Sequence, residues 1–294
     1  MQQNVLKGYL LAFIGVCVLS PDALLIRLSG NDPWVIAGWR GILTGVMILI
    51  YNHWLDRRSL KEQKANSGLR YYANMVLFAF SSFMFTYAIS NANVTDVLVI
   101  IAFTPLISAL LSAVFLHEKV LQRTWIATLV CGMGLAILFS QAGGQSAPLG
   151  LASAAGCAIL LATQFVIMRS CPEANLSSSM AFGGILGGTV CMLVSGFIIL
   201  PAPQMLAVCA IGLIVSPISF VLFVYSLRYI TAAETGLIML LESVLGSLLV
   251  WVFLGEHPSL PTTLAGLLIL GTLSIYSFLT LRDVKQSKLD STTR

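Results

Sequence analysis

Charged residues are scarce in this chain of 294 residues. Lys, Arg, Asp and Glu make up only 10% of it, whereas 57% of the residues are hydrophobic and the mean hydropathy is +0.91. A soluble globular domain carries about a quarter charged residues. This shortage of charge excludes a water-soluble globular enzyme, a disordered protein and a nucleic-acid-binding protein. The composition predicts a polytopic membrane protein.

Residue patterns that support catalysis or bind metal are missing as well. The sequence has three histidines and six cysteines, and contains no CxxC, HExxH, DxxD or GxSxG arrangement. A GxxxxGK[ST] loop for ATP phosphates is also absent. We therefore expect no catalytic residue, no metal site and no cofactor. Cysteines in apolar runs are expected to be small buried hydrophobic residues.

Long apolar stretches dominate the sequence instead. A bilayer core of about 30 Å needs about 20 apolar residues per helix. Ten stretches meet this requirement: 7–28, 33–52, 71–91, 94–116, 124–141, 149–168, 178–200, 204–226, 232–254 and 262–281. The first stretch has no A-x-A-like cleavage site and is interrupted by Ser20-Pro21-Asp22, so we interpret it as an uncleaved helix. The predicted fold class is an all-α integral membrane protein with ten transmembrane helices.

The positions of Lys and Arg predict the orientation of these helices. If both termini are cytoplasmic, Arg27 is the one basic residue outside, and Arg40 lies within the second span. All other Lys and Arg residues then fall on the cytoplasmic side, many of them in the loop 53–70. We favour a topological role for this loop over recognition of lipid head groups. The sequence predicts an N-in, C-in topology.

The two halves of the chain resemble each other. Shifted by 138 positions, one half aligns with the other: Phe85, Tyr87, Phe115, Leu116 and Glu118 meet Phe223, Tyr225, Phe253, Leu254 and Glu256. Shifted by 142, Gly41 and Gly45 meet Gly183 and Gly187. We expect a first repeat at 1–141, a second at 149–283 and a cytoplasmic tail at 284–294. Because each repeat holds five spans, an odd number, the second must be inverted relative to the first. Inverted repeats are typical of secondary transporters, whose solute site lies between the halves.

Specific stretches also resemble the EamA repeat of the drug/metabolite transporter superfamily. They are AAETGLIMLLESVLG at 232–246, FLGE at 253–256, TPL at 104–106, FLHE at 115–118 and WRG at 39–41. The resemblance covers about 8–281, and departs from the usual pattern at Ser243, where many members have Pro, and at His117, where Gly is common. It implies a ten-helix exporter of the inner membrane. The family's solutes include amino acids, nucleotide-related metabolites, sugars and drugs, so the resemblance does not name the solute.

Ionisable residues at membrane depth are costly, by about 2.5–3.5 kcal/mol on insertion scales, and are candidates for function. Asp22 in the first span and Arg40 in the second lie at a similar depth. One interpretation is a structural ion pair that holds the two helices together. The other is functional: Asp22 titrates with a proton, or Arg40 holds a solute carboxylate.

Four further residues complete the candidate substrate site. Glu242 lies in the middle of the ninth span. It is a candidate proton carrier or ligand of a solute ammonium group, or a protonated carboxyl bonded to a neighbouring helix. Gln164, the repeat partner of Asp22, can donate and accept hydrogen bonds. Tyr87 and Tyr225 are repeat partners near opposite ends of the pathway, where they either bind solute or belong to the aromatic belt.

The sequence thus predicts a secondary transporter that exports a small metabolite, such as an amino acid or a related amphipathic compound. Its expected partners are the solute and the lipid bilayer, with no nucleic acid. Proton coupling, exchange and facilitation stay open, as does assembly into a homo-oligomer. The alternatives are a membrane enzyme acting on lipids or isoprenoids, which requires clustered acid–base or metal-binding groups, and a non-transporting sensor.

Overall fold

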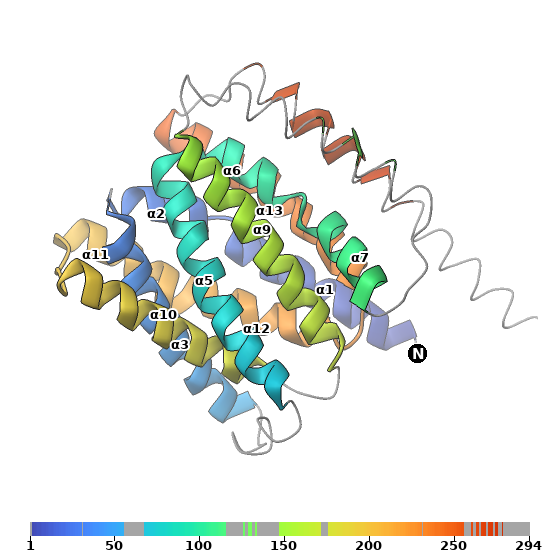
Figure 1. Cartoon of the computed structure of the whole chain (residues 1–294), viewed down its shortest axis with the longest axis horizontal. Helices are drawn as coiled ribbons and strands as arrows, with labels where there is room; N and C mark the ends of the chain where they lie inside the picture. The colour runs from blue at the N-terminus through green and yellow to red at the C-terminus, as the bar shows by residue number, and fades with distance from the viewer. Residues whose placement is uncertain are drawn as a thin grey trace, which may run out of the picture.

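The computed structural model describes residues 2–30, 32–55, 68–115, 147–171, 176–230 and 232–255, with isolated residues between 126 and 133 and between 260 and 278. Within these ranges the chain is helical and forms no strand. The helices are α1 (Gln2–Leu19), α2 (Asp22–Leu28), α3 (Pro33–Leu55), α5 (Leu69–Asn91), α6 (Val94–Ile101), α7 (Thr104–Phe115), α9 (Pro148–Arg169), α10 (Ser177–Ser195), α11 (Ala202–Ala210), the π-helical η1 (Ile211–Val215), α12 (Ser216–Ser226) and α13 (Ala232–Leu254). They form one bundle (Figure 1).

The predicted spans agree with these helices over most of the chain. Among the described residues, seven stretches are long and apolar enough to cross a membrane, and α13 contributes a shorter apolar stretch at Leu241–Leu254. The fifth span (124–141) lies largely outside the described residues, whereas about half of the tenth (262–281) is described and that part is helical. The count of ten helices and the N-in, C-in orientation therefore stay predictions.

The predicted seventh span, 178–200, is too long at its end. Helix α10 ends at Ser195, because Gly196 adopts a left-handed conformation with φ of 78°. The amide of Phe197 then donates to the carbonyl of Met192 at 3.0 Å, which closes the helix. A glycine in this conformation is a common helix terminator, since it has no Cβ to clash with the backbone.

Three of the predicted spans are interrupted near their middle. The first breaks between α1 and α2, the fourth between α6 and α7, and the eighth contains the π-helical segment η1. Pro21, Pro105 and Pro217 lie at or next to these interruptions. Proline has no backbone N–H and its ring clashes with the preceding turn, so it disturbs the regular hydrogen-bond pattern. The interruption noted in the sequence at Ser20-Pro21-Asp22 is present as the break between α1 and α2, whereas the sequence analysis did not predict the other two.

The packing of the helices repeats when the two halves of the chain are exchanged. Helix α3 packs on its repeat partner α10, and α6 and α7 pack on their partner α13. The contact of α5 with α9 has its counterpart in that of α12 with α1. The contact of α5 with α10 likewise corresponds to that of α12 and η1 with α3. The two halves thus pack around a common centre, where α5 and α9 run side by side (Figure 1).

Glycines allow α3 and α10 to cross at very short distance. A Cβ atom placed on Gly41 would lie 2.7 Å from the carbonyl oxygen of Gly184, and one on Gly188 would lie 2.7 Å from that of Gly38. Neither position leaves room for a side chain. Small residues have this role in membrane helices generally, because they let backbones approach each other.

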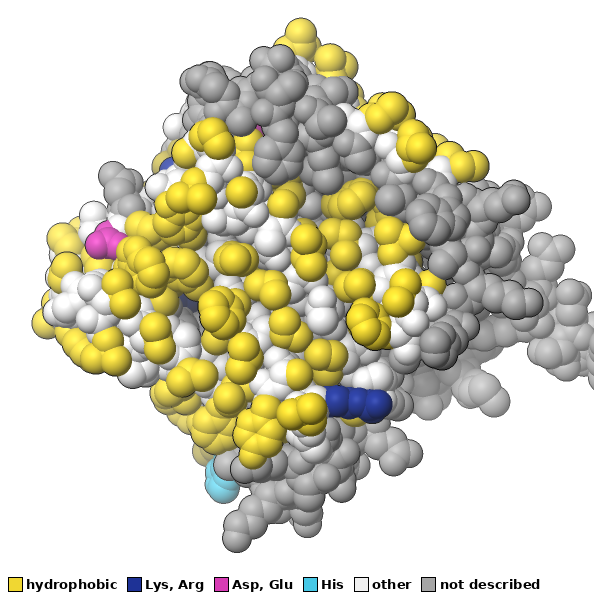
Figure 2. Space-filling model, in the orientation of Figure 1, with side chains coloured by type: hydrophobic (Ala, Val, Ile, Leu, Met, Phe, Trp, Pro, Cys, Tyr) yellow, Lys and Arg dark blue, Asp and Glu magenta, His cyan; other side chains and the backbone are white. Residues whose placement is uncertain are grey.

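The outer surface is apolar. Phe80, Leu193, Leu206 and Val252 expose between 57% and 73% of their surface. In Figure 2 hydrophobic side chains cover the middle of the face shown, and the charged side chains lie near its edge. An apolar band of this kind fits the hydrocarbon core of a bilayer, which offers no partner for charged groups.

Candidate functional site

An ion pair lies at the centre of the bundle. Nη2 of Arg40, on α3, lies 2.7 Å from Oδ2 of Asp22, on the first turn of α2. Both residues are buried, with exposed fractions of 3% and 1%. The ion pair considered from the sequence is therefore formed. In addition, the structure shows that it lies inside the protein and not at a lipid-facing contact of two helices.

Three hydroxyl groups, from α5 and α12, complete the surroundings of the pair. Nη1 of Arg40 donates to Oγ of Ser82 at 3.2 Å and to Oγ1 of Thr86 at 3.4 Å. Oγ of Ser216 donates to the other oxygen of Asp22 at 3.5 Å. The guanidinium also lies over the ring of Phe85, 5.4 Å from its centroid, a favourable contact for a cation. The pair is thus held by side chains from both halves of the chain.

A central cavity opens beside this pair. Its volume is about 60 Å³, measured as the space in which the centre of a water molecule fits, which is enough for a few waters. Three charged residues line it, Asp22, Arg40 and Glu242. The rest of its wall is formed by Leu19, Phe78, Ser81, Ser82, Phe85, Ile101, Cys157, Leu161, Phe220 and Met239. Glu242, which the sequence did not place near the predicted pair of Asp22 and Arg40, therefore meets them at one site.

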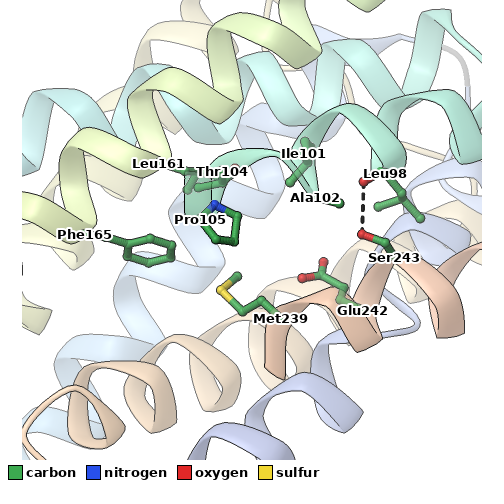
Figure 3. A pocket seen from close by; sticks show the side chains of 10 residues that line it. All are labelled: Leu98, Ile101, Ala102, Thr104, Pro105, Leu161, Phe165, Met239, Glu242 and Ser243. Atoms are coloured by element: carbon green, nitrogen blue, oxygen red, sulfur yellow. Dashed lines mark hydrogen bonds between the residues drawn. The ribbon is translucent and has the colours of Figure 1, made fainter. Parts of the chain in front are cut away.

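A smaller side pocket adjoins the central cavity and shares four lining residues with it, Ile101, Leu161, Met239 and Glu242. Its other lining residues are Leu98, Ala102, Thr104, Pro105, Phe165 and Ser243, and its volume is about 20 Å³. Figure 3 shows Glu242 extending from α13 toward the break between α6 and α7, with Phe165 across the pocket. In the described part of the chain, the Glu242 carboxylate has no hydrogen-bond partner. The other interpretation of this residue, a carboxyl bonded to a neighbouring helix, has no support among these residues.

Two of the three helix interruptions border the central cavity, and the third is linked to it by the hydrogen bond of Ser216 to Asp22. Leu19 and Asp22 lie on either side of the first, Ile101 precedes the second, and Ser216 directly follows η1. The repeat partners of these helices, α9, α13 and α5, run without a break. Broken helices are the usual source of solute sites in secondary transporters, because they bring polar backbone and side-chain groups to mid-membrane depth.

The remaining candidate residues lie farther from the cavity. Gln164 is buried, with 1% of its surface exposed, and donates through Nε2 to Oγ of Ser81 at 2.8 Å. It therefore supports the cavity wall from behind. Tyr87 packs on Phe83 with 5.9 Å between the ring centroids, and Tyr225 lies under the guanidinium of Arg228 at 4.6 Å. Neither tyrosine lines the central cavity or the side pocket.

The sequence analysis missed the hydroxyl residues around the ion pair, Ser82, Thr86 and Ser216. Each is a small polar residue inside an apolar span, and such residues are too common in membrane helices to stand out singly. A usable signal was the neighbourhood of Ser216 and Pro217, which resembles that of Asp22 and Pro21.

Comparison with protein families settles the class of the molecule. The model of the EamA-like transporter family matches the chain twice, over residues 6–140 and 148–278. The chain belongs to the EamA-like transporter family. Members of this family are transporters and not enzymes, so a small-molecule solute and the lipid bilayer are partners of this multi-pass membrane protein.

A comparison with solved structures finds a chain with a similar fold. One structure, described as "Crystal structure of protein", matches with a TM-score of 0.66 at 20% sequence identity. The match covers 94% of this chain and 97% of the other. At this level of identity the likeness concerns the fold alone. The comparison with curated proteins found no match.

Ser243, where many EamA-like proteins carry proline, contributes a hydrogen bond between repeats. Its hydroxyl donates to the carbonyl of Leu98 on α6 at 3.0 Å (Figure 3). Replacing Ser243 by alanine is expected to lower the free energy of unfolding by about 0.5–1.5 kcal/mol. The cost stays small because the same carbonyl also accepts the amide of Ala102 at 2.9 Å. Thermal unfolding of the purified variant measures this, and a loss of most of the folded protein would contradict it.

Proposed function

We propose that this EamA-like protein carries a small amphipathic metabolite through its central cavity by alternating access, and works as an exporter in the cell inner membrane. The observation that carries the proposal is the meeting of Asp22, Arg40 and Glu242 in one cavity. Charged groups at membrane depth are retained where they handle a solute or an ion. The cavity holds only a few waters, so a solute enters when the bundle opens.

The exchange symmetry of the packing supports alternating access. Two similar halves, each with an odd number of spans, are inverted relative to each other. Their exchange converts an outward-open arrangement into an inward-open one of similar energy. Such a symmetry requires that repeat partners pack on each other, as α3 does on α10 and as α6 and α7 do on α13. It also requires matched contacts, such as that of α5 with α9 and that of α12 with α1.

Within this proposal the residues differ in role. Asp22, Arg40 and Glu242 contact the solute or a coupled proton, and Gln164 positions the wall residue Ser81. Tyr87 and Tyr225 lie along the pathway on either side of this centre. The direction of export and the inner membrane both rest on the family resemblance, and the N-in, C-in orientation rests on the excess of Lys and Arg in the predicted cytoplasmic loops.

Flux from loaded proteoliposomes tests the proposal. We expect saturable, protein-dependent efflux of at least one solute from a panel of amino acids, amines and small carboxylates. Responses to an imposed pH gradient will separate proton-coupled transport from facilitation. Glu242→Gln is expected to reduce this flux at least about tenfold, since it removes an unpaired carboxylate from the cavity.

The matched control is Asp32→Asn, because Asp32 is exposed and lies outside the cavity. It caps the start of α3 by accepting the amide of Trp34 at 2.9 Å, a role that asparagine also fills. Equal flux in wild type, Glu242→Gln and Asp32→Asn would remove Glu242 from the site. Absence of flux for every member of the panel would count against the cavity as a solute pathway.

A further inference from the structure

The net charge of the cavity determines whether it favours a cationic or an anionic ligand. Among the described lining residues, Asp22 and Arg40 compensate each other at 2.7 Å, whereas Glu242 forms no ion pair of its own. With its carboxylates ionised, the cavity therefore carries one net negative charge. A cation entering it gains a partner, whereas an anion meets a like charge in a medium of low dielectric constant.

The arginine is not available to balance a solute carboxylate. Its Nη2 is engaged by Asp22, and its Nη1 by Ser82 and Thr86. The remaining Nε is enclosed by protein atoms and has no partner in the described part of the chain. A solute carboxylate would have to break the buried pair with Asp22. This arrangement disfavours anions, and also zwitterions that rely on both of their charged ends.

The surroundings of Glu242 are apolar. The wall of the side pocket next to it is formed mainly by aliphatic and aromatic side chains, Leu98, Ile101, Ala102, Pro105, Leu161, Phe165 and Met239. In Figure 3 Phe165, Pro105 and Met239 lie around the space next to the carboxylate. An ion that is fully hydrated cannot make use of such a wall, whereas an organic group gains free energy by leaving water for it.

We propose that the solute is an organic monocation, whose charged end binds the Glu242 carboxylate and whose apolar body lies against the wall of the side pocket once the bundle has opened. The inference rests on the proposed transport function and narrows its substrate class. Asp22 and Arg40 then contact the solute as a pair without net charge. The selectivity for the cation comes from Glu242 alone, and the selectivity for its size comes from the side pocket.

Binding to the full chain in lipid nanodiscs tests the charge, by titration calorimetry. The probes are trimethyl(phenethyl)ammonium, phenylalanine and 3-phenylpropionate, which share one ring but differ in charge. We expect the cation to bind at least about tenfold more tightly than the other two. Glu242→Gln should weaken cation binding at least about tenfold, whereas Glu242→Asp, which keeps the charge, and the control Asp32→Asn should preserve the preference for the cation. Tighter binding of phenylalanine or 3-phenylpropionate, unchanged in Glu242→Gln, would overturn the inference.

A series of alkyltrimethylammonium ions from ethyl to hexyl tests the pocket. Affinity is expected to rise by roughly fourfold per methylene until the pocket is full. Phe165→Ala should move the most tightly bound member to a longer chain, because it enlarges the pocket. A flat series in both proteins would overturn the role of the pocket.

The flux assay separates this inference from the proposed function. Selective binding of the cation without any flux would uphold the cation site and count against transport. Flux of phenylalanine or 3-phenylpropionate that is insensitive to Glu242→Gln would uphold transport and overturn the cation site.

Discussion

Replacing Arg40 by glutamine is expected to lower the free energy of unfolding by about 3–5 kcal/mol. The change leaves the Asp22 carboxylate buried without its counter-charge. Only the hydroxyl of Ser216, at 3.5 Å, then remains among the hydrogen-bond partners of that carboxylate. The shift in stability is measured on the protein purified in detergent. Samples are heated, and size-exclusion chromatography then gives the fraction of the protein that remains monodisperse at each temperature. Asp22→Asn, which leaves the arginine unpaired, should cost a similar amount.

The double variant Asp22→Asn/Arg40→Gln separates the two interpretations of the pair. It removes both charges, so it should regain most of the lost stability. We expect the folded double variant to have lost most of its flux, because both residues line the cavity. Full flux in this variant would give the pair a structural role alone. Equal destabilisation in the single and double variants would show that Asp22 and Arg40 do not stabilise each other.

Alanine at Gly184 is expected to destabilise the protein by about 1–3 kcal/mol, with a larger loss for leucine. The new Cβ would lie 2.8 Å from the carbonyl oxygen of Gly41, so α3 and α10 would have to move apart. These two helices are repeat partners and pack closely against each other. Stability measured by the same heating assay, together with flux, reports whether the crossing also matters for the conformational change.

Gly271 provides the matched control. It is a helical residue, and no atom of the residues that the structure describes lies within 4 Å of an added Cβ there. Alanine there should be neutral or slightly stabilising, because alanine has a higher helix propensity than glycine. If Gly184→Ala behaved like Gly271→Ala, the close crossing of α3 and α10 would not be a determinant of stability.

The candidate site was only partly predictable. Asp22 and Arg40 could be paired because two ionisable residues at similar depth in adjacent spans have a strong reason to meet. Glu242 could be recognised as unusual, but nothing in the sequence placed it beside them, since α13 and α2 are separated by most of the chain. Tyr87 and Tyr225 were suggested by the repeat, and the structure places both away from the cavity. Their role along the pathway stays a prediction.

The hydrophobicity of the sequence by itself determined that this is a helical membrane protein. In a bilayer the backbone must satisfy its own hydrogen bonds, so the length and spacing of the apolar stretches leave little freedom. The internal repeat further determined that two similar halves pack together, because similar sequences bury similar faces. These properties depend on local composition or on periodic patterns, so they can be predicted from a single sequence.

Only the tertiary structure decided where the functional centre lies. The breaks between α1 and α2 and between α6 and α7 border one cavity, and the packing of repeat partners brings Glu242 to it. Hydroxyl groups from α5 and α12 then occupy the donors of Arg40 and the free oxygen of Asp22. Side-chain contacts of this kind depend on the rotation and crossing of each helix. Small steric differences such as those at Gly41 and Gly184 set these angles, and the apolar pattern of a single helix does not encode them.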